Sequence, residues 1–117
     1  MAKNFIQPGD TITLTNEDVT DAADLASGDG YLSGSIFGVA QTDVAVGDDG
    51  EFAVVGVWEL PKVSAQAWTR GQRIYWAAAT SECTTTAGSN KLIGVATEAA
   101  DNPSATGKVR LSGAFTI

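Results

Sequence analysis

The sequence predicts an all-β fold, a small β-barrel or β-sandwich with at most one short helix, near residues 64–69. Three observations support this prediction. Apolar and polar residues alternate in several short segments. Val, Ile, Thr and aromatic residues outweigh Leu, Lys and Glu in those segments. Turns rich in Gly and Asp separate them. A chain of 117 residues can build one modest core, so we expect a single domain over residues 1–117.

The first half of the chain is expected to contain three strands. Residues 11–15 alternate as a half-buried strand does, and residues 36–41 form the second strand. Residues 51–60 form the third, which is apolar on both faces and would therefore lie centrally or be covered by a partner. Pro61 should end this strand because proline cannot donate to a ladder. Residues 16–24 are interpreted as an acidic loop, and residues 27–30 and 46–50 as turns.

The second half is expected to contain strands at residues 73–79, 91–97 and 108–117, with a short polar candidate at residues 84–86. The alternation of these segments and of those in the first half defines an expected core. Its members are Ile12, Leu14, Phe37, Val39, Phe52, Val54, Trp58, Ile74, Val95, Val109 and Leu111.

The two halves show a weak internal resemblance. Residues 36–40 (IFGVA) resemble residues 92–96 (LIGVA), each preceded by a Gly-led strand and followed by an apolar strand that carries a glycine, Gly56 or Gly113. A duplicated β-unit closing into a small barrel would produce this pattern. Chance recurrence in a chain rich in Gly and Ala would produce it equally well.

The charge balance argues against nucleic acid and membranes as partners. The formal net charge is −7, and the seven basic residues form no run. Phosphate affinity depends on Lys and Arg, and anionic membranes attract basic segments. The N-terminal residues lack an apolar signal-peptide core, so synthesis in a cytoplasm is expected.

The sequence offers little for catalysis. It contains no histidine, which removes Ser-His-Asp and Cys-His chemistry and the commonest zinc ligand. Cys83 is the only cysteine, so no intrachain disulfide forms, and its thiol would be activated only if a Lys or Arg approached it. Residues 106–108 (TGK) resemble part of a phosphate loop, but Asn102 and Val109 break the pattern.

Two groups of carboxylates, at residues 17–24 and 48–51, lack the spacing of a calcium loop and are interpreted as solvated loops. We therefore expect no catalytic, cofactor or metal site, and no enzymatic activity. A small hydrolase that uses paired carboxylates stays open as an alternative.

Several apolar residues are candidates for contacts with a protein partner. Phe5 and Ile6 precede the turn at Pro8 and Gly9, so residues 1–9 are either an arm that adds to a partner's sheet edge or a cap on the domain's own barrel. Adjacent strand residues point to opposite faces, so one aromatic ring of a neighbouring pair should leave the core. The candidate contacts are Phe5, Ile6, Val55, Val57 and the outward member of the pair Tyr75 and Trp76.

Seven motifs in order carry a resemblance to a known family. They are residues 5–10 (FIQPGD), 27–30 (SGDG), 34–40 (GSIFGVA), 56–62 (GVWELPK), 71–76 (GQRIYW), 92–97 (LIGVAT) and 109–115 (VRLSGAF). In this order they resemble the phage and prophage capsid cement family, formerly a domain of unknown function and often labelled a RecA/RadA-like recombinase. The recombinase label does not suit a chain without a phosphate loop.

The resemblance implies a decoration protein that binds the outside of an assembled phage head. Its partner would be the major capsid protein, its oligomeric state a homotrimer, and its location the virion surface after synthesis in the bacterial host cytoplasm. The alternatives are another phage structural protein, such as a head-completion or tail component, or a module that binds a host surface.

Overall fold

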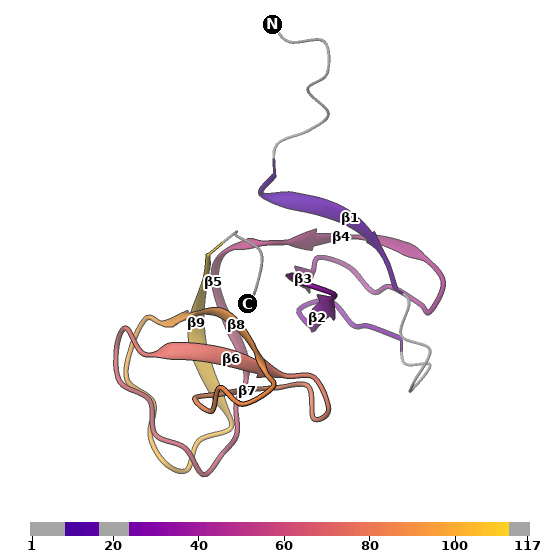
Figure 1. Cartoon of the computed structure of the whole chain (residues 1–117). Coiled ribbons are helices and arrows are strands. Elements are labelled where there is room, and N and C mark those ends of the chain that lie inside the picture. The colour runs from indigo at the N-terminus through magenta and orange to yellow at the C-terminus, as the bar shows by residue number, and fades with distance from the viewer. Residues whose placement is uncertain (1–8, 17–23, 113–117) are drawn as a thin grey trace, which may run out of the picture.

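The computed structural model describes residues 9–16 and 24–112, in which nine strands form two antiparallel sheets (Figure 1). The first sheet has the order β1-β4-β3-β2 and the second the order β5-β9-β8-β6-β7. The all-β prediction is confirmed. None of the described residues is helical, and residues 64–69 form a turn followed by an isolated bridge at Trp68. The strands are β1 (Thr11–Thr15), β2 (Gly30–Ser33), β3 (Ile36–Ala40), β4 (Asp49–Ala53), β5 (Val55–Pro61), β6 (Arg73–Ala77), β7 (Glu82–Thr84), β8 (Lys91–Ala96) and β9 (Thr106–Ser112).

The single strand predicted over residues 51–60 is two strands. The chain leaves the first sheet at Val54 and enters the second as β5, with Gly56 at a φ of +105°. Glycine adopts this left-handed backbone region without steric cost. The apolar residues of the predicted strand therefore belong to two different sheets. Phe52 and Ala53 are buried in the first sheet, whereas Val57 is 55% exposed on the second.

The two sheets are built from units of the same topology. Strands β1, β2, β3 and β4 are arranged in the order β1-β4-β3-β2, and strands β5, β6, β8 and β9 in the corresponding order β5-β9-β8-β6. The repeat suspected from the sequence is thus a structural repeat, with β3 and β8 in equivalent places. One detail of that prediction is wrong, because Gly56 lies in β5 and not in the strand that follows β3. We call residues 9–16 and 24–54 the first unit, and residues 55–112 the second unit.

The repeat extends to the connections before β2 and β6. An isolated antiparallel bridge joins Leu25 to Val44 in the first unit and Trp68 to Ala100 in the second. The following turn in each unit contains a glycine of positive φ, and a side-chain oxygen accepts a hydrogen bond from the backbone N–H three residues earlier. These acceptors are Asp29 Oδ2 for Ala26 N, at 2.9 Å, and Gln72 Oε1 for Thr69 N, at 3.0 Å.

Each unit has its own group of apolar residues inside its curved sheet. The six positions of the smaller cluster, in the first unit, have their counterparts in the larger cluster. The larger cluster also contains Phe37, Val39 and Leu32, which lie on the other face of the first sheet and contact the second unit. The ring centroids of Phe37 and Trp76 are 4.9 Å apart. The equivalent pairs are Leu14 and Leu60, Leu25 and Trp68, Tyr31 and Ile74, Ala40 and Ala96, Val44 and Ala100, and Phe52 and Val109.

Most of the expected core is confirmed, with four corrections. Ile12 and Leu14 are only half-buried because β1 is an edge strand. Trp58 is half-buried over Gly56, and its indole nitrogen donates to Val55 O at 2.9 Å. Val95 is half-buried because it lies on the outward side of β8, opposite Arg73 and Arg110, and the register shift beyond it brings Ile93 into the core. The buried apolar residues that the prediction missed include Val44, Leu60, Trp68, Trp76, Cys83, Ile93 and Ala96.

Strand β7 occurs only in the second unit. It extends the sheet beyond β6, and a parallel bridge joins Cys83 to Lys62, just after β5. Val63 N donates to Cys83 O at 3.0 Å in this contact. The second sheet therefore curls into a half-barrel, whereas the first sheet remains open between β1 and β2.

Candidate functional site

The outward surface of the second sheet combines apolar and basic side chains. Strand β9 alternates strictly, with Gly107, Val109 and Leu111 buried and the residues between them exposed. The strand registers place Val57 opposite Arg110, Arg110 opposite Val95, and Val95 opposite Arg73. One row across β5, β9, β8 and β6 thus alternates valine with arginine. Val57 and both arginines are exposed, and Val95 is half-buried.

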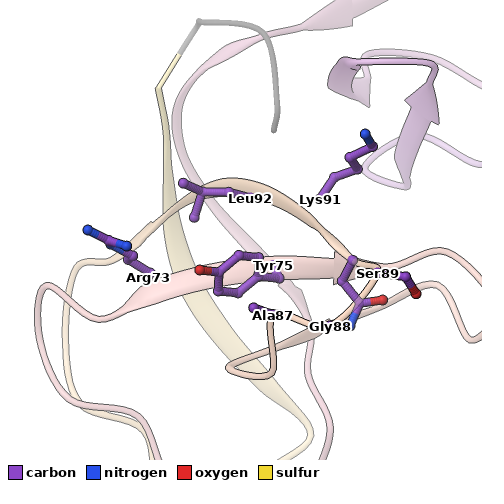
Figure 2. Close-up of a pocket in the computed structure, with 8 residues that line it drawn as sticks. Arg73, Tyr75, Ala87, Gly88, Ser89, Lys91 and Leu92 are labelled. Atoms are coloured by element: carbon purple, nitrogen blue, oxygen red, sulfur yellow. The ribbon is translucent and has the colours of Figure 1, made fainter.

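A shallow hollow continues this surface beside the row. It has a volume of about 460 Å³ and is lined by residues of β6, β8 and the loop at 87–90. Figure 2 shows the ring of Tyr75 in the middle of the hollow, with Leu92 and Arg73 beside it. Tyr75 and Leu92 are cross-strand partners and both are half-buried. We call the set Val55, Val57, Arg73, Tyr75, Leu92, Val95 and Arg110 the outer face.

Three of the contacts predicted from the sequence lie together on the outer face. They are Val55, Val57 and Tyr75, from β5 and β6. Trp76 is 3% exposed and packs in the core, so Tyr75 is the member of that pair that turns outward. Phe5 and Ile6 lie outside the described residues.

Arg73, Arg110, Leu92 and Val95 were missed, although the sequence carries a signal for the arginines. Eleven of the fourteen acidic residues fall in residues 4–61, a stretch without Lys or Arg. Six of the seven basic residues fall in residues 62–117. The basic residues form no run, but they are segregated into the second half of the chain, and the protein is electrically polarised.

The arginines of the outer face have no acidic partner among the described residues. The one ion pair in this part of the chain joins Lys108 Nζ to Glu98 Oε1 at 3.5 Å, with both side chains about half exposed. Arg73 and Arg110 are exposed and make no such pair.

Lys62 is a basic residue with a different role. Its side chain is 1% exposed, and Nζ donates to the carbonyls of Val63, Ser104 and Ser64 at 3.0, 3.3 and 3.4 Å. The ammonium also lies 5.9 Å from the centroid of the Trp68 ring. A buried charge needs such partners to offset its lost hydration. In the first unit Asn16 holds the equivalent place, and its Nδ2 donates to Val44 O at 3.2 Å.

The residues that might have carried chemistry have structural roles. Cys83 is fully buried, and its burial, with the nearby Glu82, raises the pKa of its thiol to about 12. A thiol of this pKa is protonated at neutral pH and is a poor nucleophile. Residues 106–108 lie inside β9, where Gly107 packs against the Trp68 ring, so they do not form a phosphate loop. Within residues 9–16 and 24–112, no cluster of Cys, Asp and Glu is suited to a metal ion, and no helix could span a membrane.

A small all-β domain whose exposed apolar and basic groups lie on a sheet face is typical of a protein that acts by binding other proteins. The phage cement protein family matches residues 6–111, and the chain belongs to this family. The family assignment made from the seven motifs is confirmed, and it places the protein among phage capsid structural proteins. Comparison with curated proteins and with solved structures gave no significant match.

Proposed function

We propose that this protein binds the outside of an assembled phage capsid and stabilises it, with the major capsid protein as its partner. The observation that carries the proposal is the family match over residues 6–111. The position of the exposed apolar groups on a sheet face also supports a protein that acts by binding other protein chains. The protein would be made in the bacterial host cytoplasm, act as a single domain without catalysis, and end on the virion surface.

Stabilisation would follow from mass action. A protein that binds the assembled lattice, and not the free subunits, shifts the assembly equilibrium toward the lattice. Contacts that cross from one capsid subunit to its neighbour have this preference, because dissociation of the lattice destroys the site. Each contact can be weak when one oligomer binds several lattice points at once.

We further propose that the protein acts as a homotrimer and that residues 1–9 contribute an arm to the capsid contact. Phe5 and Ile6 give this segment apolar side chains, and an extended segment can add to a sheet edge of a partner through backbone hydrogen bonds. The outer face is left for contacts between copies.

The direct test uses phage heads that lack this protein. Purified protein added to such heads should bind in hundreds of copies and raise the temperature at which the heads lose their DNA. A ring-sized number of copies would indicate a connector, and absence of binding would refute the proposal. A variant without residues 2–7 should keep its thermal transition and lose head binding. Full occupancy of heads by this variant would refute the arm alone.

A further inference from the structure

We propose that the outer face of the second unit docks on the acidic first unit of a second copy of this chain. The inference gives a surface to the self-association proposed above and rests on that part of the proposed function. It commits to a contact between unlike surfaces, one basic and apolar, the other acidic.

The outer face has the composition of a docking surface. Its row alternates Val57, Arg110, Val95 and Arg73, so an exposed and a half-buried valine lie beside two arginines that lack acidic partners among the described residues. Tyr75 and Leu92 extend the apolar area into the hollow beside the row. Interfaces between proteins are enriched in tyrosine and arginine, which combine large contact area with charged hydrogen-bond donors.

The structural repeat allows this row to be compared with its equivalent in the first unit, which is covered by the second unit. The equivalent row in the first unit consists of Thr11, Ala53, Val39 and Gly30. Val39 and Ala53 are buried, and a Cβ at Gly30 would lie 2.8 Å from the Trp76 ring of the second unit. The same face is thus a packing surface inside the chain in the first unit, whereas in the second unit Val57, Arg73 and Arg110 of this face are exposed.

The first unit supplies the opposite charge. Its described residues contain seven carboxylates and no basic side chain. Asp49 and Glu51 lie on the outward side of β4, where they accept hydrogen bonds from the hydroxyls of Thr15 and Thr13. At the positions of Val57 and Lys108 in the second unit, the first unit has Thr11 and Glu51. The exposed part of this side of the first unit is therefore acidic, whereas the outer face of the second unit is basic.

Charge also decides the geometry of the contact. A symmetric contact would place the outer face against itself and bring arginines together, which is repulsive. A head-to-tail contact places arginines against carboxylates and leaves one basic and one acidic surface for further copies. Such contacts build a ring when the rotation closes. A three-membered ring is compatible with the proposed homotrimer.

The test measures self-association of the free protein, so it does not involve the capsid. Sedimentation velocity should show oligomers at about 50 mM salt. At about 0.5 M salt the association constant should be at least tenfold lower, because screening weakens exposed charge pairs. The double variant Arg73→Glu with Arg110→Glu should weaken association at least tenfold at low salt. Arg70→Glu is the control for one such charge reversal, since it lies on an exposed turn and is not part of the outer face.

A mixing experiment tests the head-to-tail arrangement. The double variant Asp49→Lys with Glu51→Lys should also fail to associate, because its basic first unit faces a basic outer face. An equimolar mixture of the two double variants should associate again, since each now meets the opposite charge. Circular dichroism and thermal melting check that both variants are folded. Undiminished association of the Arg73 and Arg110 variant, an equal loss in the Arg70 control, or a mixture that stays monomeric would overturn the inference.

These outcomes are separable from the proposed function. If the Arg73 and Arg110 variant self-associates normally but no longer binds heads, the outer face binds the capsid and the copy-to-copy contact is refuted. If self-association follows the predictions while the wild-type protein does not bind heads, the inference stands and the capsid proposal fails.

Discussion

The two units of this protein share one topology and differ in how far they close. At three equivalent core positions the second unit buries its side chain almost completely, with Leu60, Ile74 and Trp68 at 0%, 0% and 2% exposure. The first unit leaves the equivalent Leu14, Tyr31 and Leu25 half-buried. The second unit has β7 and its bridge to Lys62, and the first unit has no counterpart among its described residues.

This difference shows that the topology of a small sheet does not by itself provide a closed core. The first unit keeps Phe52, Ala40 and Val44 buried inside its curve, but its outward row is buried only because the second unit covers it. The second unit closes on itself and leaves its outward row free. The second unit therefore covers the outward row of the first unit, and its own outward row is the exposed one.

The largest expected effect concerns the core position that differs most between the units. Trp68→Ala should destabilise the protein by about 4 kcal/mol, because it empties a large buried site. Leu25→Ala, at the half-buried equivalent position, should cost about 2 kcal/mol. Urea unfolding of both variants measures the difference. Trp68→Phe is the control, since it keeps a ring and removes an indole N–H that has no hydrogen-bond partner among the described residues. Equal losses for Trp68→Ala and Leu25→Ala would show that closure by β7 does not matter to the core.

A pair of equivalent glycines tests the close approach of strands in each unit. A Cβ at Gly94 would lie 2.1 Å from the backbone oxygen of Arg110, whereas a Cβ at Gly38 would lie 2.8 Å from the Cβ of Phe52. Gly94→Ala should therefore cost about 3 kcal/mol and Gly38→Ala less, since the added methyl group overlaps its neighbour less at Gly38. Denaturation midpoints give the order. A larger loss for Gly38→Ala would contradict the tighter packing of the second unit.

The third prediction uses the thiol of β7 as a probe of closure. Burial raises the pKa of Cys83 to about 12, from an ordinary value near 9. The folded state thus keeps a proton that the unfolded thiol loses above pH 9, so this contribution is complete below pH 9 and is lost between pH 9 and 12. From pH 9 to 10 the free energy of unfolding should fall by about 1 kcal/mol more than it does in Cys83→Ala, which has no thiol. Parallel pH profiles for the two proteins would show that β7 does not bury Cys83 in solution.

The sequence predicted most of the strands and the family, and it indicated the repeat as one of two explanations, because these depend on local pattern. Alternation located β1, β3, β8 and β9, and the similarity of residues 36–40 to residues 92–96 located equivalent strands. The sequence pattern could not predict the division of residues 51–60 between two sheets. Gly56 was visible, but only the tertiary structure decides whether a glycine marks a bend.

The candidate site was predictable only in part, for the same reason. Val55, Val57 and Tyr75 were found from apolar strand faces, but Arg73, Arg110 and Val95 join them through pairing between distant strands. The sequence left open whether Tyr75 or Trp76 points outward, because it does not show which side of β6 faces the core. The bulge between β6 and β8 likewise brings Ile93 to the buried side although Val95 faces outward, and a register shift of this kind has no signature in the alternation.

The smallest expected effect compares the units at an exposed cross-strand site. Lys108 Nζ lies 3.5 Å from Glu98 Oε1, and both side chains are about half exposed. In the first unit Glu51 takes the place of Lys108, and it accepts a hydrogen bond from Thr13 instead of forming an ion pair. Exposed ion pairs contribute little because water and salt screen them, so Lys108→Ala should change the free energy of unfolding by about 0.5 kcal/mol or less. Thermal melting at low and high salt measures this change, and Glu98→Gln is the matched control. A loss several times larger would mean that the aliphatic part of the Lys108 side chain, and not its charge, packs on β5 and β9. The exposed surface of the second unit would then contribute to the stability of this unit as well as to its contacts with partners.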